Sequence, residues 1–200
     1  MKKVVFLLGC VVCVIMIMGC ASTQAVSTEN AVTNIETVMQ DTTDTLVVDD
    51  EKRAELDQTD SVLAVSSPGY YTPYDSYSIE LEPGSYELEV ISLGNMLGFN
   101  KSIMVPMIAL LDENGKQISS KATVYEVRRN NMTLPIHIYS KWAFTSEKKQ
   151  KAYVVVHADM SSTDKVVANG MGVFGAVPFN LTLPFSRSAY AKYHITPTMQ

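Results

Sequence analysis

From about Ser61 onward, apolar and polar side chains alternate along the chain. This period of two is strongest over residues 76–82 and again over 85–90, on either side of a Pro-Gly pair that favours a turn. The apolar positions are Tyr77, Ile79 and Leu81 in the first segment and Tyr86, Leu88 and Val90 in the second. The two segments therefore predict a β-hairpin with one face exposed to water.

More segments of strand length follow along the chain. They are apolar or alternating and lie at 103–111, 122–128, 134–140, 152–158 and 179–185. Pro106 cannot donate a ladder hydrogen bond, so we expect its part of the strand at a sheet edge or a bulge. Only 161–170 looks helical, and that segment is short. About eight strands without a long helix predict an all-β domain over 61–200, an antiparallel β-sandwich of jelly-roll-like form.

Residues 20–60 have a different character. After Cys20 the segment contains no glycine, proline or aromatic residue, and ten of the 21 Asp and Glu residues lie in it against Lys52 and Arg53 alone. Such a composition buries too little apolar surface to offset the entropy of ordering, so we expect an acidic, flexible tether. Apolar residues near helical spacing within 27–40 leave a short helix as an alternative.

The N-terminus has the three parts of an export signal. Lys2 and Lys3 precede an apolar run that ends in Gly19 and Cys20. The run is shorter than the roughly 20 residues of a membrane-spanning helix, and no basic flank follows it. We therefore expect a signal peptide over 1–19, with an uncleaved signal anchor as the alternative.

The sequence Ile-Met-Gly-Cys at 17–20 resembles the lipobox of bacterial lipoproteins. The resemblance implies that the Cys20 thiol accepts a diacylglyceryl group and that Cys20 becomes the lipidated first residue of the mature protein. Acyl chains such as palmitate contribute roughly 0.8 kcal/mol per buried methylene to membrane binding. In a Gram-negative cell, Ala21 after the cysteine resembles the signal for sorting to the outer membrane, which implies a place on its periplasmic face.

Charge and cysteine content narrow the function further. Residues 61–200 carry eleven acidic and twelve basic side chains and show no basic stripe, so we do not expect nucleic acid as a partner. The three cysteines are Cys10, Cys13 and Cys20, which leaves no disulfide framework in the expected domain. The sequence lacks a nucleophile elbow, a P-loop and a dinucleotide fingerprint, and its three histidines are widely separated. We expect no enzyme, no cofactor and no metal site.

A tyrosine cluster is the one candidate ligand site. It comprises Tyr70, Tyr71, Tyr74 and Tyr77. Tyrosine rings stack on sugar rings while their hydroxyls bond polar groups, so a carbohydrate is the ligand class we expect here. The alternative is that these tyrosines cover one end of the sandwich.

Four segments together resemble the maltose operon periplasmic protein (MalM) family. They read YSIELEPGSYELEVISL, VPMIALLDENGKQIS, KAYVVVHAD and DKVVANGMG. The resemblance implies a β-sandwich in the cell envelope, accessory to maltose or maltodextrin transport, and it carries over no catalytic residues. The first two segments also resemble the jelly-roll modules of secreted bacterial peptidases. A structural or assembly lipoprotein that binds another envelope protein through a sheet edge is the alternative function.

Overall fold

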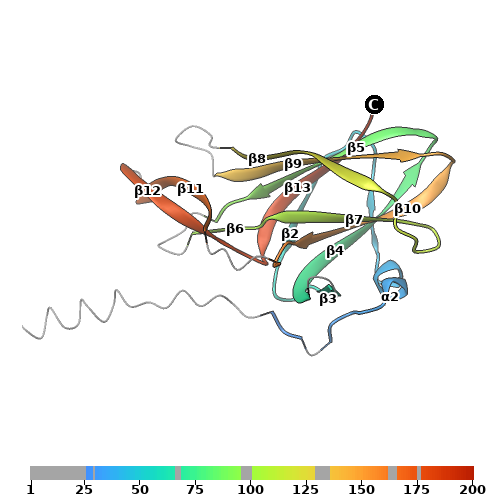
Figure 1. Ribbon diagram of the computed structural model, residues 1–200, viewed down its shortest axis with the longest axis horizontal. Helices are drawn as coiled ribbons and strands as arrows, with labels where there is room; N and C mark the ends of the chain where they lie inside the picture. Colours follow the sequence, from blue (N-terminus) through green and yellow to red (C-terminus); the bar gives the residue numbers. More distant parts are fainter. Residues whose placement is uncertain are drawn as a thin grey trace, which may run out of the picture.

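The computed structural model describes residues 26–28, 30–65, 69–95, 101–128, 136–161, 166–174 and 177–200. The expected signal peptide, the lipobox and Cys20 lie outside these residues. No helix in the described part of the chain is long and apolar enough to cross a membrane. The predicted all-β class is confirmed, because two main sheets pack face to face as a β-sandwich (Figure 1).

The first sheet is built around the long strand β4. Its strands are, in spatial order, β1 (Asp44–Leu46), β4 (Tyr70–Leu81), β10 (Gln150–Ala158) and β7 (Pro106–Asp112), and β3 (Val62–Val65) also pairs with β4. Strand β10 runs antiparallel to both neighbours, whereas β1 runs parallel to β4. Pro106 is the first residue of β7, which ends the sheet, so the edge position predicted from this proline is confirmed.

The second sheet is antiparallel throughout. Its order is β2 (Lys52–Leu56), β13 (Ala191–Met199), β5 (Gly84–Leu93), β9 (His137–Ser146) and β8 (Ser120–Arg128). A smaller third sheet contains β11 (Val166–Phe174), β12 (Val177–Arg187) and the two-residue β6 (Ser102–Ile103). A short helix, α2 (Ile35–Gln40), is packed beside the first sheet.

The helix predicted over 161–170 is wrong. From Val166 the chain forms β11, which pairs antiparallel with β12. Helical spacing over so few residues is a weak preference, since a short isolated helix is marginal in water. Adjacent valines at 166–167 favour a strand, and the neighbouring strand supplies the backbone hydrogen bonds.

The hairpin predicted for 76–90 is also wrong, although its alternation is right. Strand β4 belongs to the first sheet and β5 to the second, so the turn at 82–83 carries the chain from one sheet to the other. The predicted apolar positions of both strands are 2 % exposed or less and face each other across the sandwich. A period of two fixes which side chains point inward, but it does not fix which strand is the hydrogen-bonded neighbour.

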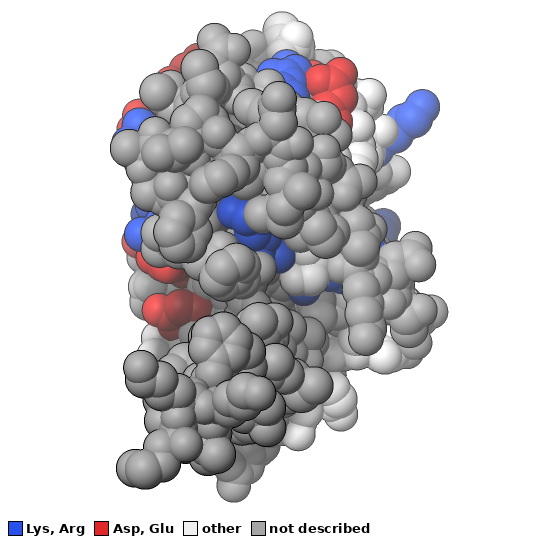
Figure 2. Space-filling view, turned by 90° about the vertical axis from the view of Figure 1, so that its left-hand side faces the viewer, with Lys and Arg blue, Asp and Glu red and all other residues white. Residues whose placement is uncertain are grey.

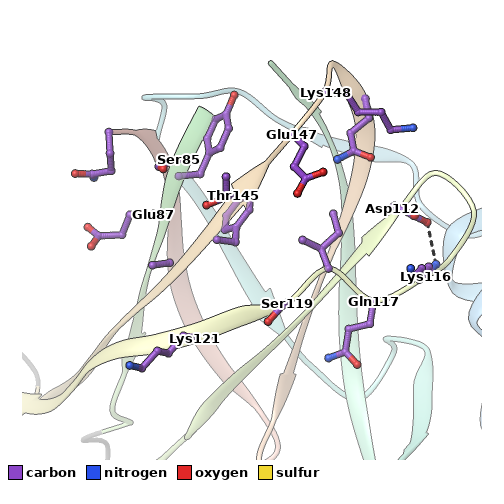
Figure 3. A pocket seen from close by; sticks show the side chains of 16 residues that line it. Ser85, Glu87, Asp112, Lys116, Gln117, Ser119, Lys121, Thr145, Glu147 and Lys148 are labelled. Carbon is purple, nitrogen blue, oxygen red and sulfur yellow. Dashed lines mark hydrogen bonds between the residues drawn. The ribbon is translucent and has the colours of Figure 1, made fainter. Parts of the chain in front are cut away.

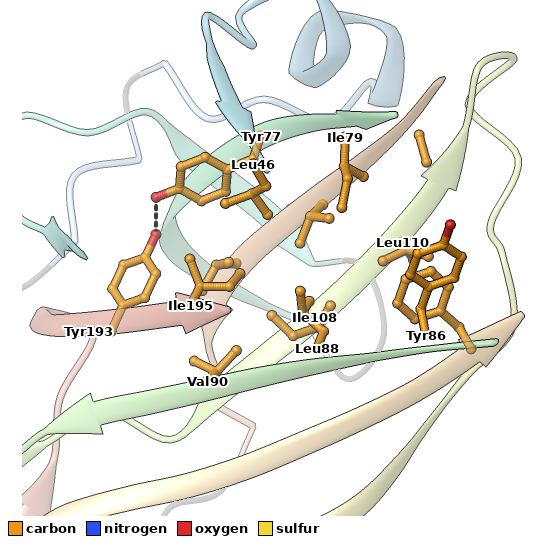
Figure 4. Close-up of a cluster of buried hydrophobic side chains, with 14 of the residues drawn as sticks. Leu46, Tyr77, Ile79, Tyr86, Leu88, Val90, Ile108, Leu110, Tyr193 and Ile195 are labelled. Atoms are coloured by element: carbon orange, nitrogen blue, oxygen red, sulfur yellow. Dashed lines mark hydrogen bonds between the residues drawn. The ribbon is translucent and has the colours of Figure 1, made fainter. Parts of the chain in front are cut away.

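The main core fills the space between these two sheets (Figure 4). Its fully buried members include Ile79, Leu88, Val90, Leu110, Val154 and Ile195. The rings of Tyr86 and Phe144 stack with centroids 5.4 Å apart near one end of this core. Burying one such side chain contributes about 1.5–3 kcal/mol, so this layer is the main source of stability.

The flexible tether expected over 20–60 is wrong for the described residues from Val32 onward. Leu46 on β1 and Leu56 on β2 are buried in the main core, and Val38 on α2 is fully buried against the first sheet. Strand β1 adds to the edge of one sheet and β2 to the edge of the other, and Val32 forms a bridge with Leu63. The prediction failed because it relied on composition. An edge strand needs only one or two apolar side chains when its neighbour supplies the backbone hydrogen bonds. The folded domain therefore begins well before residue 61.

Candidate ligand-binding groove

The predicted tyrosine site is not a single cluster in the structure. Tyr74 and Tyr77 are 3 % and 2 % exposed, so the ligand-binding prediction is wrong for these two residues. Tyr70 is partly buried, with its ring centroid 6.4 Å from that of His157, while Tyr71 is 47 % exposed. Because side chains on a strand alternate between faces, four tyrosines on β4 do not gather into one platform.

The structure offers a different candidate at the end of the sandwich where β5 starts and β9 ends. A groove of about 880 Å³ lies there, between the β7–β8 connection and the β9–β10 turn, and the C-terminal Gln200 also lines it (Figure 3). We call it the end groove. Its polar lining residues are Ser85, Glu87, Asp112, Lys116, Gln117, Ser119, Lys121, Thr145, Glu147, Lys148, Gln150 and Gln200.

One wall of the end groove is shaped by the Asp-Glu-Asn-Gly turn at 112–115. The Asp112 Oδ1 atom accepts hydrogen bonds from the backbone N–H groups of Asn114 and Lys116, both at 2.9 Å. Gly115 has a φ of 76°, a conformation that glycine adopts without steric cost. The Ile118 N–H then donates to the Leu110 carbonyl at 2.8 Å. These bonds hold residues 116–119 in place along the groove.

The opposite wall is the turn between β9 and β10. The Ser146 hydroxyl donates to the Lys148 carbonyl at 2.8 Å and accepts a hydrogen bond from the Gln150 side chain at 2.9 Å. Lys148 also reaches across to Glu113, with 3.1 Å between Nζ and Oε1. Both side chains of this ion pair are exposed, so it contributes little stability and a ligand could displace it.

The floor of the end groove is formed by two aromatic side chains that are buried. Tyr86 and Phe144 are 2 % and 5 % exposed, so neither ring offers a free face. The Tyr86 hydroxyl donates to the Glu82 carbonyl and accepts from the Glu82 N–H, each at 2.9 Å. A ligand in the end groove would therefore be held by hydrogen bonds from the walls rather than by ring stacking.

The end groove offers polar and charged groups for contact with a ligand. Its lining contains carboxylates, ammonium groups, amides and hydroxyls, and neither histidine nor cysteine is among the residues that line it. Within the described ranges, no three His, Cys, Asp or Glu side chains come together as a metal site. Of the histidines, His157 is buried, which lowers its pKa and keeps the ring neutral at pH 7.

The end groove could not be found from the sequence, because its walls come from four separate regions. These are 85–87, 112–121, 143–150 and residue 200. Only residues 112–115 and the basic run at 148–151 carry a local signal, and both patterns are typical of exposed turns. Their proximity follows from the pairing of β5 with β9 and of β10 with β7, which the sequence pattern does not encode.

Figure 2 shows the opposite end of the sandwich, which lies at the left of Figure 1. Described basic and acidic side chains lie beside each other at the top and along the left margin of this view. Elsewhere on the surface, too, described charges are often paired, as in Lys52–Asp44 at 3.0 Å and Lys192–Glu55 at 3.6 Å. Because acidic and basic side chains are mixed on these surfaces, their charge indicates no particular class of ligand. We therefore place the candidate site in the end groove.

Comparison of the chain with known protein families and with curated proteins finds no match.

Proposed function

We propose that this protein is a lipid-anchored, non-enzymatic binding protein of the bacterial cell envelope, and that its end groove binds a carbohydrate. The observation that carries the proposal is the polar lining of the groove. Hydrogen-bond donors and acceptors converge on it from the 116–119 segment, the β9–β10 turn and the start of β5. This arrangement suits a ligand with many hydroxyl groups, each of which both donates and accepts.

Two further points favour a sugar. The volume of about 880 Å³ falls in the range of small-molecule sites, which is roughly 300–1,000 Å³. The resemblance to the MalM family directs the choice toward maltose or maltodextrins and toward an accessory role in their transport, on the periplasmic face of the outer membrane.

The fold also changes what a lipid on Cys20 would do. Because Val32 already pairs with Leu63, only residues 21–31 would separate the lipid from this bridge, rather than 40 residues. Eleven residues span at most roughly 36–40 Å, so the domain would sit within that distance of the lipid surface.

Calorimetric titration of the full chain with maltodextrins tests the ligand. We expect saturable binding that Gln117→Ala and Glu147→Ala each weaken by about 2- to 10-fold, the loss of one or two hydrogen bonds. Glu80→Ala is the matched control, since Glu80 is exposed on β4 and does not line the groove. Absence of binding, or equal weakening by all three substitutions, would refute a sugar site in the groove.

The anchor is tested separately. We expect a metabolic palmitate analogue to label the wild-type protein and Cys20→Ala to abolish both the label and membrane association. An unlabelled wild type, or a Cys20→Ala protein that stays bound to membranes, would refute the anchor without bearing on the groove.

The second candidate function is that of a structural or assembly lipoprotein that binds another protein through a sheet edge. The open edge of β8, at the end of the second sheet, favours it. Affinity capture with and without maltodextrins separates the two functions. A protein partner recovered equally well in both conditions supports assembly, whereas stabilisation of the chain that depends on sugar supports binding.

A further inference from the structure

Strand β8 is unusually open for an element of a sandwich. It is the last strand of the second sheet, and seven of its nine residues are exposed. Tyr125 is 51 % exposed and Val127 is 37 % exposed. Natural sheet edges are normally protected because their unpaired N–H and C=O groups can bind another strand.

The inner face of β8 is apolar. Tyr125 lies opposite Ser140 and Val127 opposite Ile138, two β9 residues that are buried. A bulge between Ala122 and Val124 shifts the register, so that Ala122 lies opposite Trp142 and shares this face with Tyr125. The face is only partly covered, because β7 is the last strand of the opposing sheet and packs against β9.

The outer face of β8 carries charges of both signs. They belong to Lys121 near its start and to Glu126 and Arg128 near its end. Arg128 pairs with Glu126 at 3.0 Å and lies 3.5 Å above the ring centroid of Tyr139. A strand that runs antiparallel to β8 with the same sequence would therefore meet opposite charges.

We propose that two copies of the chain pair antiparallel through β8, about a two-fold axis, and join their second sheets into one. In the register that sets Lys121 opposite Glu126 of the second copy, symmetry makes this pair twice. The same register sets Ala122 opposite Tyr125 of the second copy, also twice, on the inner face. Lys121 and Glu126 are five residues apart, and Ala122 and Tyr125 are three apart. In a regular strand, residues an odd number apart point to opposite faces. The extra residue of the bulge places the two members of each pair on the same face.

Competing registers are less favourable. A pairing centred on Glu126 sets two carboxylates against each other, and like charges directly opposite are destabilising. A shift by one residue from the proposed register sets Lys121 opposite Tyr125 or Val127 and loses both charge pairs. A pairing centred on Val127 also sets Glu126 opposite Arg128 of the second copy, but it pairs only three residues of each β8, whereas the proposed register pairs eight.

The dimer should be weak. A single strand edge buries less surface than a standard stable interface of about 1,200–2,000 Å². We expect association that rises with concentration and falls with salt, because exposed charge pairs are screened. The inference does not depend on the lipid anchor. Lys121 also lines the end groove, so the dimer is tested by sedimentation without sugar rather than by ligand binding.

Sedimentation of the full chain in detergent, over a range of concentrations and without sugar, tests the dimer. Lys121→Glu and Glu126→Lys should each weaken association by about tenfold or more, because two attractive pairs become repulsive. The double substitution exchanges the charges and should restore association. Lys151→Glu, an exposed change on β10, should leave it unaltered.

Thermal unfolding of each variant checks the fold, and Tyr125→Lys gives an independent probe of the inner face. A chain that is monomeric at every concentration would overturn the proposal. So would failure of the double substitution to restore association, or an unchanged dimer in Tyr125→Lys. Association with a different protein through β8 in place of a second copy would also overturn it.

Discussion

The hydroxyl oxygens of Tyr77 and Tyr193 lie 2.5 Å apart in the core of the sandwich (Figure 4). Tyr77 is on β4 of the first sheet and Tyr193 on β13 of the second, so this hydrogen bond joins the two sheets. Tyr193 donates its one hydroxyl proton to Asp75 Oδ2 at 2.5 Å and accepts from Tyr77, whose hydroxyl also lies 3.2 Å from that carboxylate oxygen. Burial raises the pKa of both phenols, so they keep their protons and remain donors.

Removing one hydroxyl from this network should destabilise the fold. Tyr193→Phe leaves the ring in place but takes a donor from a half-buried carboxylate, and we expect the free energy of unfolding to fall by about 1–3 kcal/mol. Tyr71→Phe is the matched control, since Tyr71 is 47 % exposed, and it should change stability by less than about 0.5 kcal/mol. Denaturant unfolding measures both, and equal effects of the two substitutions would contradict a structural role for the network.

The same carboxyl predicts how stability depends on pH. Burial raises the pKa of Asp75 above its ordinary value of 3.8, and the hydrogen bonds from Tyr193 and Tyr77 only partly oppose this. Between pH 3.8 and the raised pKa, Asp75 therefore keeps its proton in the folded state and has lost it in the unfolded state. Stability should fall as pH rises from 3.8 through the raised pKa of the folded state, and Asp75→Asn should remove this fall.

Asp57 provides a control of opposite sign for that experiment. Hydrogen bonds from the Thr59 hydroxyl and N–H lower the pKa of Asp57. Its contribution is present above the ordinary value of 3.8 and is lost as pH falls through the lowered pKa of the folded state. Unfolding of the wild type, Asp75→Asn and Asp57→Asn should be measured from below to above pH 3.8. With rising pH, the contribution of Asp75 to the free energy of unfolding should fall, whereas that of Asp57 should rise, which gives slopes of opposite sign. Slopes of the same sign would count against the assignment.

Much of the sandwich could be predicted from the alternation of side chains. The inward positions of β4 and β5 are those that the period of two selects, because a one-residue slip would expose every apolar side chain of a strand. The edge position of β7 followed from Pro106, which has no N–H to donate. These features are local, so a single sequence contains them.

Features that depend on pairing between distant segments could not be predicted. The separation of β4 and β5 into different sheets depends on β10 and β13, which lie far along the chain. The end groove likewise needs residues from four separate regions of the chain, between Ser85 and Gln200. Strands β1 and β2 went unrecognised because each contributes only one buried leucine, and an acidic composition outweighs that signal.

Substitution of those leucines tests whether the acidic segment belongs to the fold. Leu46→Ala and Leu56→Ala should each reduce the free energy of unfolding by about 2–5 kcal/mol, since both side chains are almost fully buried in the main core. Val47→Ala should have little effect, because Val47 is 61 % exposed. Denaturant unfolding of all three variants, fitted with one common dependence of the free energy of unfolding on denaturant concentration, measures these differences. If the leucine variants matched Val47→Ala, the segment would behave as a tether after all.

Gly84, the first residue of β5, and Gly94, which directly follows this strand, should differ sharply in their tolerance of a methyl group. A Cβ on Gly94 would lie 2.8 Å from the carbonyl oxygen of Ile136 and 3.0 Å from the Phe185 ring, and the Gly94 N–H already donates to that carbonyl at 2.8 Å. Backbone and a packed ring cannot yield easily, so Gly94→Ala should cost about 1–3 kcal/mol through forced shifts.

The atom nearest to a Cβ added at Gly84 belongs to a flexible side chain. A Cβ there would lie 2.6 Å from the terminal methyl of Met199, a flexible side chain that is 48 % exposed and can rotate away. We expect Gly84→Ala to change the midpoint of thermal unfolding by no more than a few degrees and Gly94→Ala to lower it clearly further. Because neither glycine has a positive φ, the difference between the two variants isolates the cost of close packing from that of backbone strain. Equal midpoints would mean that the strand end at Gly94 can move away from Ile136, and so that β5 and β9 are less tightly joined there than the structure indicates.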